Sequence, residues 1–481
     1  MFEQCDPTET PESSAMIERI CSSSRRENCE AAGRLAAVAE LFAYRLSRST
    51  ESEDWAIDTT EVVAAEIAAA LRISQELAVS MIGYARAMRE RLPKIGALFE
   101  AGDLDLAMFR TLVYRTDLIT DADVLAAVDA ELAAAVPRWL SMVSRGHLAA
   151  KVDRIVKRHD SDAVRRRREA AAQREIWIHE RLDGLADIGG TVSATDGRTF
   201  DQRLAALAAT VCERDPRTQD QRRSDAVGAL SIGADRIACQ CGQPDCAAVG
   251  APPASPVVIH VIAEQAALEG HSDVPGSFVE ADGLIPAEQL PSLAESAKIR
   301  PLIHPGDAPA EPGYTPSRAL AEFVRCRDLT CRFPGCDKSA ETCDIDHTIP
   351  YDDGGPTQAA NLKCLCRRHH LLKTFCGWRD KQLRDGTIIW RSPSGDIYVT
   401  TPGSALLFPT LCAPTAPVTE RVIPDVRPRT AMMPRRTRTR AQNRAARIEA
   451  ERRDNRRDRE LHYAYFAALP PPRDDVDPPP F

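Results

Sequence analysis

The stretch from Cys331 to Trp378 concentrates cysteine, histidine and acidic residues at spacings that suit metal ions. Cys331 and Cys336 enclose an Arg-Phe-Pro-Gly turn, and Cys366 and His369 are separated by two residues. Two short-range ligand pairs with a hairpin-sized insert are typical of a closed, structural Zn²⁺ site. Because so short a segment has little apolar core, the ion would also stabilise its fold. The alternative, coincidental free cysteines, is disfavoured by the pairing.

The residues between the two ligand pairs predict elements that would gather a second set of polar side chains. A strand, a turn, a second strand and a helix are predicted over residues 344–349, 352–355, 361–365 and 367–375. Asp346 and His347 fall at the end of the first strand, and His370 lies on the helix. This order would bring the three side chains into one small volume.

Each of these residue types suits phosphodiester hydrolysis. Asp346 and His370 can hold one divalent cation, Mg²⁺ or another, and leave its other positions to water and phosphate. His347 can deprotonate the attacking water, because neutral imidazole is available near neutral pH. Asn361 can bridge the loop and fix the backbone of His347, since an amide both donates and accepts.

Basic residues on the predicted helix are candidates for DNA contact. Lys373, Arg367 and Arg368 could neutralise phosphates. Lys and Arg number 35 against 49 Asp and Glu in residues 1–320, 12 against 11 in 321–400, and 15 against 10 in 401–481. Binding to an acidic polymer is therefore expected from the C-terminal third of the chain.

The set Asp346-His347, Asn361 and His370, framed by the two ligand pairs, resembles the HNH endonuclease family over roughly residues 320–380. The resemblance implies a ββα-metal fold and a DNA endonuclease. Many members carry Cys-x-x-Cys-His at the helix start, whereas this chain has Cys366-x-x-His369-His370, so His369 would replace the second cysteine. More broadly, the chain resembles actinobacterial repeat-family HNH proteins, in which a helical domain of unknown function precedes the nuclease. That resemblance implies a link to mobile elements.

The elements that must position this site predict an α+β protein: a mostly α-helical N-terminal domain with a small β-hairpin, a zinc-stabilised nuclease domain, and a disordered charged tail. The expected organisation is a flexible lead over residues 1–30, a mainly helical domain over 31–299, a linker over 300–317, a nuclease domain with a C-terminal hairpin over 318–402, and a Pro- and Arg-rich tail over 403–481, partly helical near 435–460.

Three features outside the central stretch leave alternatives open. The helices flanking Arg72-Ile73-Ser74 form either a DNA-reading helix-turn-helix or an ordinary antiparallel pair, and the acidic residues nearby favour the pair. The Arg-rich helix near 435–460 either adds phosphate affinity or is partly self-paired. Cys239, Cys241 and Cys246 either ligate zinc with a fourth ligand from elsewhere or remain thiols.

The whole chain points to a cytoplasmic protein without a membrane span, because it has no apolar window of the required length and its N-terminus lacks an apolar signal core. Its expected partner is DNA, and the acidic helical domain could mediate homo-oligomers or bind a protein. The leading hypothesis is a metal-dependent DNA endonuclease. The rival is a non-catalytic, zinc-stabilised nucleic-acid-binding or interaction protein, and an RNA-directed nuclease is a third possibility.

Overall fold

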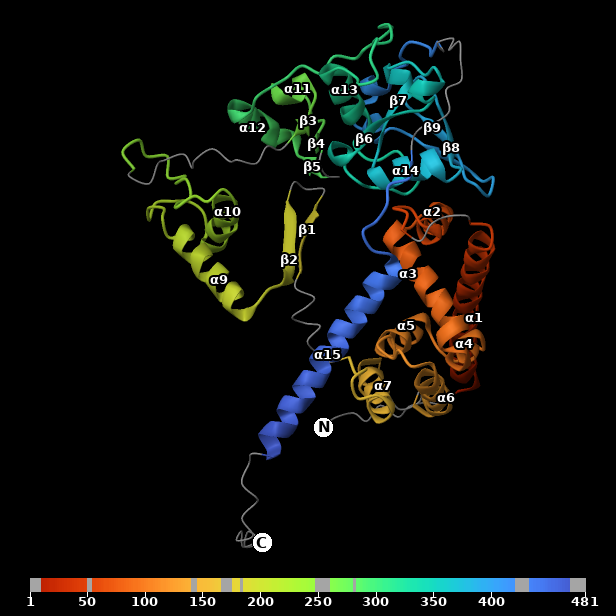
Figure 1. The fold of residues 1–481 in the computed structure, drawn as a ribbon. Coiled ribbons are helices and arrows are strands. Elements are labelled where there is room, and N and C mark those ends of the chain that lie inside the picture. The colour runs from red at the N-terminus through yellow and green to blue at the C-terminus, as the bar shows by residue number, and fades with distance from the viewer. Residues whose placement is uncertain are drawn as a thin grey trace.

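The computed structural model confirms the α+β class, with helices dominating the N-terminal half and small antiparallel sheets elsewhere (Figure 1). It describes residues 10–49, 54–139, 145–165, 175–181, 185–246, 260–279, 283–419 and 432–467. Within these ranges no helix combines the length and the apolar character that a bilayer crossing requires.

The N-terminal helical unit packs around one apolar core. Its elements are α1 (Pro11–Leu46), α2 (Thr59–Leu71), α3 (Gln75–Arg86), the π-helical turn η1 (Ala87–Arg91), α4 (Pro93–Glu100), α5 (Leu106–Arg115), α6 (Ala122–Trp139) and α7 (Arg145–His159). The expected flexible lead is wrong from residue 11 onward. Thr10 and Ser13 form a capping box and Pro11 occupies the first turn, so α1 starts 20 residues before the predicted Ala31.

The middle of the chain forms smaller units. A hairpin forms from β1 (Glu175–Glu180) paired with β2 (Ala186–Thr191); its second strand lies earlier than the expected 190–194, because Ser193 caps the next helix. Helices α9 (Ala194–Ala208) and α10 (Gln219–Ser231) share a small core of their own. A three-stranded sheet follows, made of β3 (Val261–Ile262), β4 (Gly276–Phe278) and β5 (Leu284–Ile285), with α11 (Gln265–Leu268), the 3-10 turn η2 (Ala287–Gln289) and α12 (Leu290–Ser296). The apolar run at 257–263 is described only from residue 260, and Val261 and Ile262 of this run form β3.

The nuclease-like unit begins with α13 (Arg318–Asp328) and holds the predicted strand, strand and helix. These are β6 (Asp344–His347), β7 (Leu362–Leu365) and α14 (Arg367–Phe375). A second sheet follows from β8 (Arg379–Gln382), β9 (Ile388–Arg391) and β10 (Ile397–Thr400). Short 3-10 turns lie at η3 (Ala340–Thr342), η4 (Tyr351–Asp353), η5 (Ala359–Asn361), η6 (Gly403–Ala405) and η7 (Pro409–Cys412). Buried Arg327 donates to the carbonyls of Ala359 and Leu362 and so ties α13 to β7.

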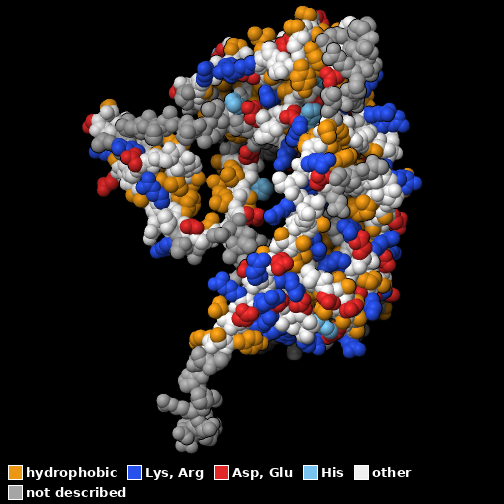
Figure 2. Space-filling view, viewed as in Figure 1, with side chains coloured by type: hydrophobic (Ala, Val, Ile, Leu, Met, Phe, Trp, Pro, Cys, Tyr) orange, Lys and Arg blue, Asp and Glu red, His pale blue; other side chains and the backbone are white. Residues whose placement is uncertain are grey.

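The Arg-rich helix α15 (Arg440–Ala467) returns to the N-terminal unit, where Ile448 enters its core. Arginines of α15, and Arg436 just before it, pair with acidic residues of that unit or directly after it: Arg436 and Arg440 with Asp58, Arg444 with Asp117, Arg452 with Asp160, and Arg456 and Arg459 with Asp162. Figure 2 shows these opposite charges interleaved along the helix. These pairs join the segment to the N-terminal unit, an arrangement that differs from both interpretations, phosphate binding and pairing within the helix.

Candidate functional site

The predicted zinc ligands meet at the start of α14. One potential ligand atom from each of Cys331, Cys336, Cys366 and His369 lies within 4.8 Å of all the others. His369 Nδ1 is 3.5 Å from Cys331 Sγ and 3.3 Å from Cys366 Sγ. Tetrahedral zinc with bonds of about 2.0–2.3 Å would separate its ligand atoms by roughly 3.5–3.8 Å. The cluster thus has the composition and size of a closed zinc site.

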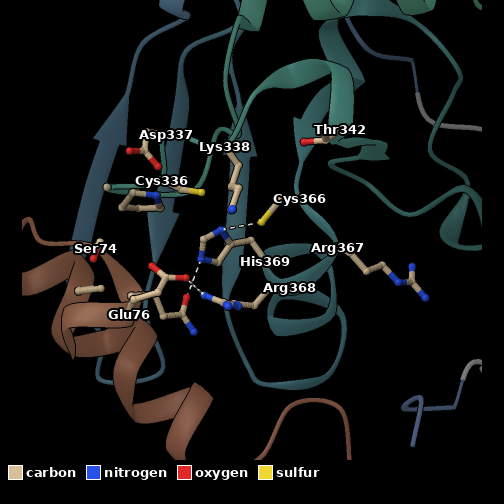
Figure 3. Close-up of a pocket in the computed structure, with 14 residues that line it drawn as sticks. Ser74, Glu76, Cys336, Asp337, Lys338, Thr342, Cys366, Arg367, Arg368 and His369 are labelled. Atoms are coloured by element: carbon tan, nitrogen blue, oxygen red, sulfur yellow. Dashed lines mark hydrogen bonds and ion pairs between the residues drawn. The ribbon is translucent and has the colours of Figure 1, made fainter. Parts of the chain in front are cut away.

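His369 is oriented by a residue of the N-terminal unit. Gln75, the first residue of α3, donates its amide nitrogen to the Glu61 carboxylate at 2.6 Å, so its amide oxygen faces His369 Nε2 at 2.9 Å. An amide oxygen only accepts, so His369 carries its proton on Nε2 and directs the lone pair of Nδ1 at the cysteines. Phe333 stacks on a face of the His369 ring, with ring centroids 3.9 Å apart. Figure 3 shows α3 beneath this cluster.

The thiols respond to one another in a way that favours a bound cation. Hydrogen bonds from Cys331 and Cys336, aided by His369, lower the pKa of Cys366, and burial raises the pKa of Cys331. A bound cation would stabilise the thiolates by opposing the cost of burial.

Of the second predicted set, Asp346 and His370 lie together, whereas the side chain of His347 contacts Thr357, Tyr314 and Tyr351. His370 Nε2 lies 3.3 Å from Asp346 Oδ1, and His370 Nδ1 lies 2.9 Å from Asp344 Oδ2. Because a carboxylate accepts, Nδ1 donates to Asp344, and in neutral imidazole Nε2 then faces the Asp346 oxygen as a second acceptor. A cation between them would stabilise this arrangement. Octahedral Mg²⁺ at 2.0–2.1 Å separates adjacent ligands by about 3.0 Å, close to the observed spacing.

Asp346 is kept ionised by a buried lysine, Lys363, and a nearly buried one, Lys373. Lys363 and Lys373 lie 2.6 and 2.7 Å from its Oδ2. Burial opposes ionisation, but these lysines and His370 outweigh it and lower the pKa of Asp346 to about 2. Lys363 also contacts Asp380 at 2.7 Å. The role of Lys363 was missed in the sequence, although Lys363 lies in the predicted second strand. It pairs directly with Asp346 in the strand register, a position in which opposite charges attract.

His347 is held by a residue that sequence reasoning also missed. Thr357 Oγ1 lies 2.9 Å from His347 Nε2 and 2.6 Å from the carbonyl of Gly313. Because the hydroxyl donates its only proton to that carbonyl, Nε2–H must donate to Thr357, and Nδ1 is the basic nitrogen. Tyr314 stacks on the imidazole at 5.3 Å. Part of the expected linker thus lies against the candidate base.

Asn361 spans the loop after β6, but its hydrogen bonds there are with Thr348, Ile349 and Pro356 rather than with the backbone of His347. Its side-chain oxygen accepts from Ile349 N at 2.8 Å, its amide donates to the carbonyls of Ile349 and Pro356, and its own carbonyl accepts from Thr348 N. Gly355 is essential to this packing, because a Cβ there would lie 1.8 Å from the Ile349 oxygen and 2.9 Å from Asn361 Nδ2.

The three basic residues proposed for DNA contact lie in different surroundings. Lys373 is nearly buried, and its ammonium contacts Asp346 and the His347 carbonyl. Arg368 pairs with Glu76 of α3 at 2.8 Å, a contact drawn in Figure 3. The side chain of Arg367 is 64% exposed beside Asp344, so of the three it is the one open to a large ligand.

Comparison with known proteins divides the chain at the end of α13. Residues 22–328 match the family described as "Domain of unknown function (DUF222)", and residues 326–375 match the HNH endonuclease family. An uncharacterized protein of Mycobacterium tuberculosis strain H37Rv is 43% identical over 493 residues, covering 93% of this chain and 89% of the relative. A second from that strain is 42% identical over 481 residues, covering 93% and 91%. No solved structure matches.

The family match to residues 22–328 covers more than half of the chain, and the relatives align along nearly all of it. The second match contains the cluster of Cys331, Cys336, Cys366 and His369 and the Asp346–His370 pair. This chain therefore belongs to the DUF222 family and carries an HNH endonuclease domain toward its C-terminus.

Proposed function

We propose that the protein is a metal-dependent endonuclease that hydrolyses phosphodiester bonds in DNA. The observation that carries the proposal is the pair Asp346 Oδ1 and His370 Nε2, which lie 3.3 Å apart and are each held in place by other groups. Lys363 and Lys373 occupy the other carboxylate oxygen, and Asp344 fixes the histidine tautomer. A carboxylate and an imidazole converging in this way suit a hydrated divalent cation.

His347 is the proposed general base. Its donation to Thr357 makes Nδ1 the basic nitrogen in neutral imidazole, and Nδ1 is the atom that we assign to take the proton from the attacking water. Asn361 supports this role by fixing the loop that follows the histidine. When bound at Asp346 and His370, Mg²⁺ or another divalent cation would supply charge stabilisation for the phosphate and the departing oxygen. Arg367, and to a lesser extent Arg368 and Lys373, would contact the DNA backbone.

Cys331, Cys336, Cys366 and His369 are proposed to hold a structural Zn²⁺. Adjacent histidines then serve different ions: His369 points toward the cysteines and His370 toward Asp346. Successive residues on a helix point in directions about 100° apart, which is why neighbours in sequence can serve separate sites.

The test is nicking of supercoiled plasmid by the full-length protein with Mg²⁺ or Mn²⁺. His347→Ala and His370→Ala are each expected to lower the rate by roughly 10²–10⁴-fold, whereas His271→Ala, at an exposed histidine far along the chain, should leave it unchanged. Activity that persists in His347→Ala would refute the mechanism.

The same assay separates the rival functions. EDTA can remove structural zinc as well as the catalytic cation, so bound zinc is measured in parallel. In protein that still holds its zinc, the activity lost in EDTA should return when Mg²⁺ alone is added. DNA binding without cleavage under every metal would favour the non-catalytic module. Faster cleavage of RNA than of DNA under matched conditions would favour an RNA-directed nuclease.

A further inference from the structure

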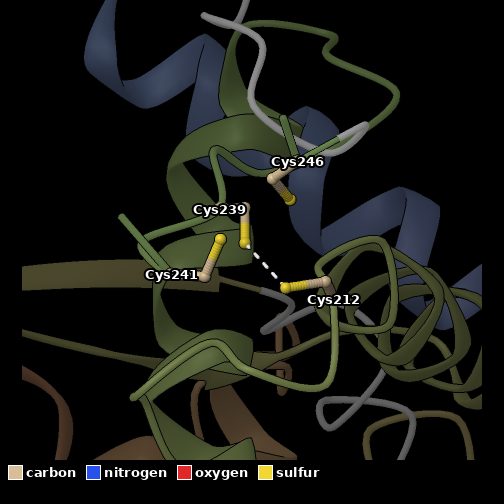
Figure 4. A group of neighbouring side chains, drawn as sticks. All are labelled: Cys212, Cys239, Cys241 and Cys246. Carbon is tan, nitrogen blue, oxygen red and sulfur yellow. Dashed lines mark hydrogen bonds between the residues drawn. The ribbon is translucent and has the colours of Figure 1, made fainter. Parts of the chain in front are cut away.

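A second group of cysteines lies far from the nuclease domain, beside α9 and α10. Cys212 follows α9, and Cys239, Cys241 and Cys246 follow α10. Their four sulfur atoms lie within 4.8 Å of one another, and Figure 4 shows the side chains converging from two chain segments. Cys212 therefore brings a fourth sulfur to the three that lie close together in the sequence.

The sulfur spacing suits a metal ion better than a disulfide. Cys212 Sγ and Cys239 Sγ are 3.6 Å apart. A disulfide requires about 2.05 Å. Tetrahedral zinc with Zn–S bonds of about 2.3 Å places its sulfurs roughly 3.8 Å apart, so the four sulfurs need only small shifts to enclose an ion.

The two segments are held in register by groups other than the cysteines. The side chain of Asp215 is fully buried; its backbone N–H donates to the Cys212 carbonyl, and its carboxylate accepts from Gln240 N at 2.9 Å. Arg217 pairs with Asp215 at 2.7 Å and donates to the Ala238 carbonyl. The buried carboxylate therefore joins the backbone beside Cys212 to the backbone between Cys239 and Cys241, and so brings the thiols together.

The α9–α10 unit has little else to stabilise it. Its core consists of a few buried side chains, mostly small or aliphatic: Leu204, Leu207, Ala226, Ala229, Ala234 and Ile237. Units below about 70–80 residues rarely gain enough from such a core and commonly rely on disulfides or a structural metal. Metal binding by thiolates would supply that free energy directly.

We propose that Cys212, Cys239, Cys241 and Cys246 bind one structural Zn²⁺ ion that clamps α9 to α10. Four protein ligands fill the tetrahedron and leave no position for water, so the role is structural rather than catalytic. The site is separate from the nuclease domain, and its existence is independent of whether the protein cleaves DNA.

The first experiment counts zinc in the full-length protein purified under reducing conditions, by inductively coupled plasma mass spectrometry. The wild type is expected to carry two zinc ions per chain, Cys239→Ser one, Cys331→Ser one, and the double variant none. Cys21→Ser, at an exposed cysteine on α1, should keep both. One zinc in the wild type that only Cys331→Ser loses would overturn the proposal.

The second experiment identifies the ligands by cobalt substitution. Cobalt in Cys331→Ser should show stronger sulfur-to-metal charge transfer per ion than cobalt in Cys239→Ser, because it is bound by four thiolates rather than three and an imidazole. If Cys239→Ser does not fold, Cys246→His replaces it: this variant keeps a zinc ligand, so it should retain two zinc ions and shift the cobalt spectrum. An unchanged spectrum in Cys246→His, or a Cys212–Cys239 disulfide in the native protein, would refute the assignment.

Discussion

The contact between Gln75 and His369 predicts that the N-terminal unit tunes the proposed zinc site of the nuclease domain. The hydrogen bond is 2.9 Å long and both residues are buried. Replacing Gln75 with Leu keeps most of the volume but removes the acceptor that fixes the histidine tautomer. Loss of such an outer partner typically costs 10–100-fold in metal affinity, or about 1.4–2.7 kcal/mol.

The assay is a competitive titration of zinc against a chromophoric chelator, performed in a Cys239→Ser background so that a single cluster contributes. Gln75→Leu is expected to weaken zinc binding within that range. Gln75→Glu keeps an acceptor and should bind at least as tightly as Gln75→Leu. Zinc affinity in Gln75→Leu equal to that of the parent would refute the reasoning, because the amide would then have no role in orienting His369.

Three further predictions concern stability. The folded-state pKa of Asp346, about 2, lies below its ordinary value of 3.8. The stability that its ionised form contributes should therefore be present above about pH 4 and be lost as the pH falls toward 2. The free energies of unfolding of the wild type and Asp346→Asn should converge over that pH window. Gly355→Ala should lower the free energy of unfolding by roughly 1–3 kcal/mol, and with it Tm, because the added Cβ would meet the Ile349 oxygen. The control Gly33→Ala, with open space on α1, should be neutral or stabilising, and equal effects of the two substitutions would contradict the packing argument. Arg440→Ala should lower Tm with little change in DNA affinity, because its guanidinium pairs with Asp58 and Glu61, and the opposite pattern in Tm and binding assays would restore a DNA-contact role.

The long tertiary contacts explain several features that sequence patterns did not reveal. The start of α1 is a local exception: it depends on the cap at Thr10, and the first turns of the helix have no apolar stripe that would mark it in the sequence. Gln75 lies nearly 300 positions from His369, and no local spacing connects them. Likewise, Thr357 and Gly313 hold His347 across a segment that composition alone suggested was a linker.

The sequence by itself determined the local units. Alternation and turn residues located β6, β7 and α14 to within about two residues, and the residue types Asp346, His347, Asn361 and His370 indicated the chemistry before any fold was known. Short spacings also marked Cys331 with Cys336 and Cys366 with His369, because ligand pairs only a few residues apart are constrained by the turn between them.

Only the tertiary structure decided which side chains complete these sites. Cys212 joins the three cysteines that follow α10 because Asp215 ties two distant loops together. Lys363 and Lys373 hold Asp346 ionised because a buried carboxylate must be balanced by charges packed against it. The burial and direction of a side chain depend on everything that packs around it, and a spacing in the sequence does not contain that information.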